Sequence, residues 1–173
     1  MEDFYFKSAK ATFDMICDEM EAEETQGIID TSPCGMGVRE IFELDLAQFL
    51  MFLMSSDGKL DDNEVKAFEL MTGRSDSKSE IFGKIMKNNL DAKEFATTVP
   101  LSLQIIVDYE LMLRSEDADV MEKMPSLTDA YMTLLGLIGM MLNTADGEVT
   151  PDEHQGYMSY MNMVKSYIQE KGL

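Results

Sequence analysis

The sequence predicts an all-α protein, and three observations support this fold class. Apolar residues recur three and four positions apart in most segments, which is the period of one face of an α-helix. No segment shows the alternation of apolar and polar residues that is typical of strands, and proline falls at the joints between the proposed helices. Because 173 residues suffice for one core, we expect a single-domain bundle of about seven helices over residues 1–173.

The charge of the chain restricts its partners. It has 33 acidic and 14 basic side chains, a formal net charge of -19, which repels nucleic acid and anionic lipid and attracts cations and basic protein surfaces. We therefore expect a protein partner, with a basic surface as the candidate, and no nucleic acid. The chain starts without a basic targeting segment, and its longest apolar run, 130–142, is too short to span a bilayer. These features predict a cytoplasmic protein without membrane insertion.

The individual helices are predicted from apolar spacing and from the residues that start them. Ser77 with Glu80, Ser126 with Asp129, and Thr150 before Pro151 are typical helix starts. The predicted helices cover residues 2–24, 38–56, 61–73, 77–86, a short segment within 91–99, 101–113, 127–144 and 151–170. Loops are expected over 26–37 and 115–125.

Three further side-chain patterns have more than one interpretation. The acidic end of the first helix, from Asp18 to Glu24, is interpreted as a solvated face that frays into water, because carboxylates oppose the helix dipole there. Asp45 lies inside an apolar helix and is either at a solvent edge or buried with a partner; we favour the edge. The 17 methionines suit an irregular core or an adaptable partner surface, and we favour the core.

One short stretch occurs twice. Residues 57–64 and 146–153 both read Asp-Gly, any residue, an aliphatic residue, three further positions and Glu. At the offset of 89 residues that separates them, apolar positions of the flanking segments coincide, for example Phe42 with Tyr131. We therefore predict two related helix-turn-helix units, 38–90 and 126–173, about an approximate two-fold axis. The remaining parts are an N-terminal helix and loop, 1–37, and connecting helices, 91–125.

The Asp-Gly turns have a structural and a functional explanation. A capping box accounts for the glycines and for Glu64 and Glu153, but Asp57 and Asp146 each follow a long helix, whose negative end disfavours a carboxylate. Either a local turn of the aspartate onto backbone N–H groups or a bound divalent cation would offset this. An ordinary EF-hand is disfavoured, because its first ligand position is leucine in both copies. Two isolated cysteines and one histidine cannot build a zinc cage, so any ligands would be oxygens.

The two motifs, an apolar helix ending in Ser-Asp-Gly or Ala-Asp-Gly with Glu six residues after Gly, resemble the TerB-like family of tellurite-resistance and stress-associated proteins. The resemblance implies an all-helical fold and a divalent metal site, with calcium, magnesium, manganese or zinc as the candidate ions. Carried over to this sequence, it points to Asp57, Glu64, Asp146 and Glu153. It implies a sensing or protein-interaction role. Two alternatives stay open: a structural interaction module without metal, and a metal-dependent hydrolase.

Overall fold

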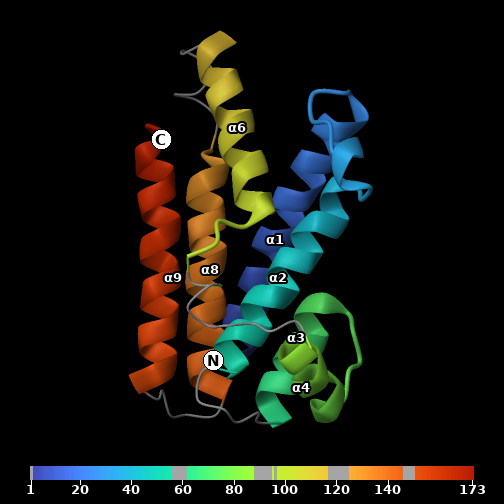
Figure 1. The fold of residues 1–173 in the computed structure, drawn as a ribbon, viewed down its shortest axis with the longest axis vertical. Coiled ribbons are helices and arrows are strands. Elements are labelled where there is room, and N and C mark those ends of the chain that lie inside the picture. The colour runs from blue at the N-terminus through green and yellow to red at the C-terminus, as the bar shows by residue number, and fades with distance from the viewer. Residues whose placement is uncertain (1, 56–61, 88–94, 96, 117–124, 146–150) are drawn as a thin grey trace.

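The structure, a computed structural model, describes residues 2–55, 62–87, 95, 97–116, 125–145 and 151–173 (Figure 1). This part of the chain contains seven α-helices and one short 3-10 helix, and no strand. The helices are α1 (Glu2–Thr25), η1 (Ser32–Cys34), α2 (Val38–Ser55), α3 (Asp62–Thr72), α4 (Lys78–Lys87), α6 (Leu101–Glu116), α8 (Leu127–Ala145) and α9 (Pro151–Glu170). The predicted fold class and number of helices are confirmed.

Two of the predicted helix starts are seen in atomic detail. The Ser77 N–H donates to Glu80 Oε2 at 2.7 Å, and the N–H of Glu80 donates back to Ser77 Oγ at 3.4 Å, the reciprocal pair of a capping box. At the start of α8, the N–H of Asp129 donates to Ser126 Oγ at 3.1 Å. The start predicted at Thr150 and most of the segment predicted within 91–99 lie outside the described residues.

The helix boundaries follow the offset of 89 residues that separates the two sequence motifs. α2 begins at Val38 and α8 at Leu127, which are 89 positions apart, and the same offset separates the first residues of α3 and α9. The units differ after that point, because α3 ends before Gly73, whose φ of +68° stops a helix at low cost. The equivalent position in the second unit, Asn162, lies inside α9.

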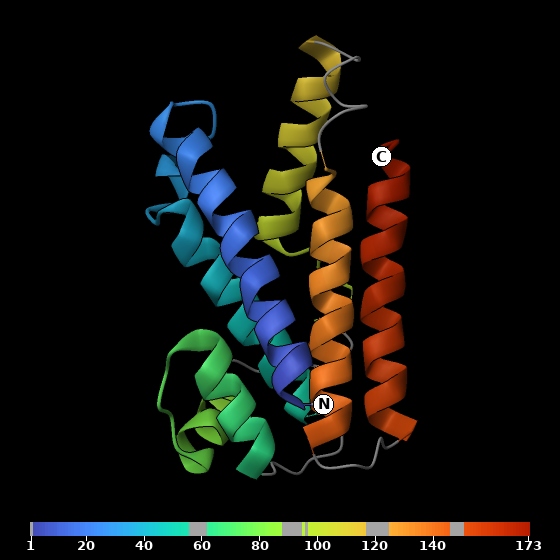
Figure 2. The ribbon, with the colours of Figure 1, turned by 180° about the vertical axis from the view of Figure 1, so that it is seen from behind.

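Contacts between helices extend the repeat to three helices. α1 packs against α8 and α6 packs against α2, while α3 contacts α8 and α9 contacts α2. In this pattern of contacts α1, α2 and α3 correspond to α6, α8 and α9, although α1 packs much more extensively on α8 than α6 does on α2. Figure 2 shows the largest of these contacts, α1 running alongside α8. The helix before each predicted helix-turn-helix pair therefore belongs to the repeated unit.

α2 and α8 supply much of the core. Each has apolar residues around most of its circumference, as expected for a helix in the middle of a bundle, and the predicted stripe of α1 is buried from Ala9 to Met20. At one end of α2 the aromatic rings of Phe49, Phe52, Phe95 and Tyr160 pack together in stacked and tilted pairs, with centroids 4.6 to 6.2 Å apart. No described helix combines the length and apolar character needed to cross a membrane.

The C-terminal end of α1 is closed and does not fray as predicted. Gly27 adopts a φ of +76°, its N–H donates to the carbonyl of Glu24 at 3.0 Å, and the N–H of Ile28 donates to the carbonyl of Glu23 at 3.0 Å. This pair of hydrogen bonds is the Schellman arrangement, which satisfies the last carbonyls of a helix. The loop that follows is thereby directed back toward the start of α2.

Candidate functional site

The four predicted metal ligands are described only in part. Asp57 and Asp146 lie outside the described residues, and so does the side chain of Glu153 in the first turn of α9. Glu64 lies in the first turn of α3 and is 6% exposed. Within the described part of the chain, no three His, Cys, Asp or Glu side chains are close enough together to hold a metal ion.

The helices on either side of the two Asp-Gly turns end close to one another. In both views of the ribbon, the C-terminal ends of α2 and α8 and the N-terminal end of α9 lie at the same end of the bundle, drawn at the bottom of Figure 1. The N-terminal end of α3 lies there too, and α3 contacts α8 while α2 contacts α9.

Three acidic side chains elsewhere cap the start of a helix further along the chain. The Glu24 carboxylate accepts hydrogen bonds from the N–H of Val38, at 3.1 and 3.2 Å, and from the hydroxyl of Thr31. Glu110 accepts hydrogen bonds from the N–H groups of Leu127 and Thr128 and from the Thr128 hydroxyl, the last at 2.8 Å. Val38 and Leu127 are the equivalent first residues of α2 and α8. A glutamate of an earlier helix therefore satisfies each of these two equivalent helix starts.

Asp45 is the third such cap; its side chain is only partly buried and also has a hydrogen-bonding partner, so each of the two interpretations from the sequence holds in part. Its Oδ2 accepts a hydrogen bond of 2.7 Å from the N–H of Ser102 at the start of α6, and the N–H of Leu101 and the Ser102 hydroxyl also bond to it. Burial raises the pKa of the Asp45 carboxyl above its usual value, and these hydrogen bonds counteract part of the rise. The partner that stabilises this carboxylate is the N-terminus of a helix rather than a basic side chain.

A chain of buried hydroxyl groups leads to Asp45. The Tyr131 hydroxyl lies 3.2 Å from Ser102 Oγ and also bonds to the hydroxyl of Tyr160. Burial is the main cause that raises the pKa of both tyrosines, and the nearby Asp45 charge adds to it. Both phenols are therefore neutral at physiological pH. The chain joins α2, α6, α8 and α9 at one buried point, where its polar atoms satisfy one another.

The acidic segment of α1 is not a simple solvated face. The Arg39 guanidinium on α2 contacts Asp18 Oδ1 at 2.5 Å and Glu21 Oε2 at 2.7 Å. The Tyr109 hydroxyl of α6 hydrogen-bonds to Glu23, and burial followed by this bond raises its pKa to about 12. These contacts attach α1 to two other helices through its carboxylates, which the charge pattern alone did not predict.

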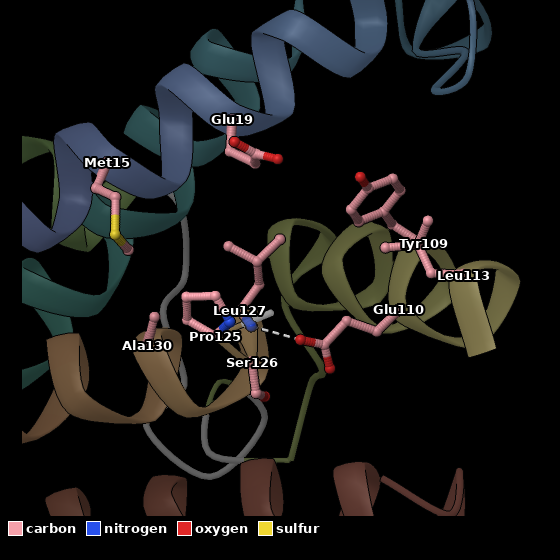
Figure 3. A pocket seen from close by; sticks show the side chains of 9 residues that line it. All are labelled: Met15, Glu19, Tyr109, Glu110, Leu113, Pro125, Ser126, Leu127 and Ala130. Carbon is pink, nitrogen blue, oxygen red and sulfur yellow. Dashed lines mark hydrogen bonds between the residues drawn. The ribbon is translucent and has the colours of Figure 1, made fainter. Parts of the chain in front are cut away.

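A hollow of about 120 Å³ lies beside the Glu110 cap, where α1, α6 and the start of α8 meet (Figure 3). Figure 3 shows Glu19 on α1, Tyr109 on α6 and Leu127 at the start of α8 on three sides of it. No described residue donates a hydrogen bond to the Glu19 carboxylate, and none of the lining residues is basic. We call this the α1–α6–α8 hollow; it is lined by Met15, Glu19, Tyr109, Glu110, Leu113, Pro125, Ser126, Leu127 and Ala130.

The methionines occur both in the core and on the surface. Met51, Met54, Met141 and Met161 are buried, as favoured from the sequence, whereas four others among the described residues are exposed: Met15 by 46%, Met36 by 36%, Met140 by 46% and Met158 by 41%. Met15 lines the α1–α6–α8 hollow.

The sequence contained a signal for two of the capping sites. Leu101-Ser102 and Leu127-Thr128 both place an apolar residue and then a hydroxyl residue at the first two positions of a helix. A hydroxyl that is 1% or 4% exposed at such a place needs a partner. The identity of that partner depends on which helix packs nearby.

Comparison of the chain with protein-family models, with curated proteins and with solved structures finds no match. Membership of the TerB-like family stays a prediction.

Proposed function

We propose that this chain is a cytoplasmic interaction module whose acidic α1–α2 hairpin binds a basic segment of a partner protein. The observation that carries the proposal is the uneven distribution of charge. Arg39 is the one basic residue between Lys10 and Lys59, an interval that also contains eleven acidic residues. Helices α1 and α2 occupy most of this interval.

Arg39 does not neutralise the hairpin. Its guanidinium is already engaged by Asp18 and Glu21, with Asp14 Oδ1 at 3.9 Å. Other carboxylates of the hairpin, among them Glu19, Glu40 and Glu43, have no basic side chain within ion-pair distance among the described residues. Such a field attracts a cationic segment over a Debye length of about 10 Å at moderate salt and repels nucleic acid.

The proposal is tested with short fluorescent lysine–serine peptides. Anisotropy titrations at about 50 mM and about 500 mM NaCl should show binding that weakens at least about ten-fold at the higher salt concentration. Replacing Glu40 and Glu43 together by glutamine should weaken binding several-fold, whereas Asp152→Asn with Glu170→Gln on α9 should not. Equal losses from the two pairs would show that net charge, and not the hairpin, attracts the peptide.

A second candidate function is the binding of a divalent cation at the two Asp-Gly turns, through Asp57, Glu64, Asp146 and Glu153. Two observations support it. The helices that flank the two turns have their adjoining ends at the same end of the bundle, and Glu64, in the first turn of α3, is buried. A cation shared by the turns would offset the repulsion between their carboxylates.

The melting temperature distinguishes the two functions. A bound cation stabilises the folded state by about 2.7 kcal/mol at a hundred times its Kd, so calcium, magnesium, manganese or zinc should raise the melting temperature above that in EDTA at constant ionic strength. The double variant Asp57→Asn with Asp146→Asn should lose the effect, and Asp108→Asn with Asp129→Asn should keep it. A rise that persists without the turn aspartates would contradict this site.

A further inference from the structure

We propose that the α1–α6–α8 hollow receives an aliphatic side chain, such as leucine or methionine, of the basic segment that the module binds. This inference rests on the proposed interaction function. It adds the place where the partner is recognised and the kind of residue that is recognised there.

The size and lining of the hollow suit an aliphatic group. Its volume of about 120 Å³ is close to that of a cavity of about 150 Å³ that admits benzene. Much of its wall is apolar, from Met15, Leu113, Leu127 and Ala130. Met15 is 46% exposed, and its unbranched thioether can adjust to the shape of an inserted side chain.

The charges around the hollow select a cationic neighbour for that side chain. Glu19 lies at its edge on α1 (Figure 3), while the Glu110 carboxylate is occupied by the start of α8. A lysine or arginine close to the inserted residue can therefore pair with Glu19. A second copy of this chain is a poor occupant, because each copy carries a net charge of -19 and the two would repel each other.

Two peptides of equal charge test the aliphatic contact without any change to the protein. A lysine–serine peptide with one central leucine should bind about ten-fold more tightly than the same peptide with alanine, because the larger side chain buries more apolar surface. Ala130→Leu, which fills the hollow, should remove this preference. Ser159→Leu on α9, where an exposed residue is enlarged in the same way, should keep it.

NMR of the protein labelled at its methionine methyl groups reports on the hollow directly. The resonance that disappears in Met15→Leu identifies Met15, and it should shift when the leucine peptide binds and shift less with the alanine peptide. Glu19→Gln should weaken binding of both peptides about three-fold, and Glu170→Gln should not.

The possible outcomes separate this inference from the function on which it rests. Equal affinities for the two peptides, with salt dependence retained, would overturn the hollow as the binding site and leave the interaction function standing. No binding of either peptide would overturn both. A Met15 resonance that shifts with protein concentration would assign the hollow to a second copy. If the Met15 resonance shifts when Met121 is replaced by alanine, without any peptide, the hollow would be assigned to residues 117–124 of the same chain. Either of these two results would overturn the proposal.

Discussion

The Glu110 side chain is 2% exposed, and two backbone N–H groups and one hydroxyl hold its carboxylate. A buried carboxylate costs several kcal/mol unless its lost hydration is replaced. Here the first N–H groups of α8 and the positive end of its dipole replace it. The contact therefore stabilises both partners: the buried Glu110 carboxylate and the first N–H groups of α8 would each be unfavourable without the other.

Replacement of Glu110 should be costly for stability. Glu110→Ala leaves the N–H groups of Leu127 and Thr128 without their acceptor and should lower the free energy of unfolding by about 3 kcal/mol. Glu110→Gln, which keeps one acceptor oxygen, should lower it by about 1 to 2 kcal/mol. Urea unfolding followed by circular dichroism measures both, with the exposed Glu170→Gln as control. A loss below about 0.5 kcal/mol for Glu110→Ala would contradict the capping role.

Asp45 should make stability depend on pH. Its pKa is raised above the ordinary 3.8, chiefly by burial, so the folded state binds its proton more tightly than the unfolded state. Its contribution to stability is therefore complete below the unfolded pKa and is lost as the pH rises through the folded pKa. The free energy of unfolding of the wild type minus that of Asp45→Asn should fall from about pH 3.5 upward and then level off. The exposed Asp129→Asn should not show this trend.

At the scale of single helices, α8 contains two glycines in different surroundings. A Cβ at Gly139 would lie 2.7 Å from the ring of Tyr157 on α9, whereas a Cβ at Gly136 would meet nothing within 4 Å. Gly139 thus permits the close approach of α8 and α9. Gly136 has no such role, and it costs stability because glycine loses more conformational freedom on folding than other residues do.

These two glycines should respond to alanine in opposite directions. Gly136→Ala should raise the free energy of unfolding by about 0.5 to 1 kcal/mol, because alanine favours the helix. Gly139→Ala should lower it by about 1 to 3 kcal/mol, because the Tyr157 ring must move. Thermal and urea unfolding of both variants check this. Stabilisation by Gly139→Ala would show that the ring moves aside at little cost.

At the scale of the whole molecule, a net charge of -19 is spread over one small bundle. Like charges on a compact surface repel one another more strongly than in the expanded unfolded chain. The helix starts capped by Glu24, Asp45 and Glu110 and the guanidinium of Arg39 compensate part of this negative charge. Most carboxylates in the described part of the chain have no such compensation.

Salt should therefore stabilise the protein. Raising NaCl from about 20 mM to about 300 mM shortens the Debye length and should raise the melting temperature by a few degrees. Tetramethylammonium chloride at equal ionic strength should act alike, because screening does not depend on the kind of cation. A rise confined to divalent cations would point to the Asp-Gly turns instead.

The sequence by itself determined the all-α class, the number of helices and the repeat at an offset of 89 residues. These features follow from local information: apolar periodicity, capping residues and the conformational freedom of glycine at turns. Ser77, Ser126 and the stripe of α1 all behave as the local pattern predicts.

Tertiary structure alone decided which groups the capping carboxylates meet. Glu24, Glu110 and Asp45 cap helix starts that lie 14, 17 and 57 residues further along the chain. A periodic pattern shows that Asp45 lies on an apolar helix, but not which helix end will be packed against it. The α1–α6–α8 hollow has the same origin, because its walls come from three helices whose distances and angles are set by packing of the complete core.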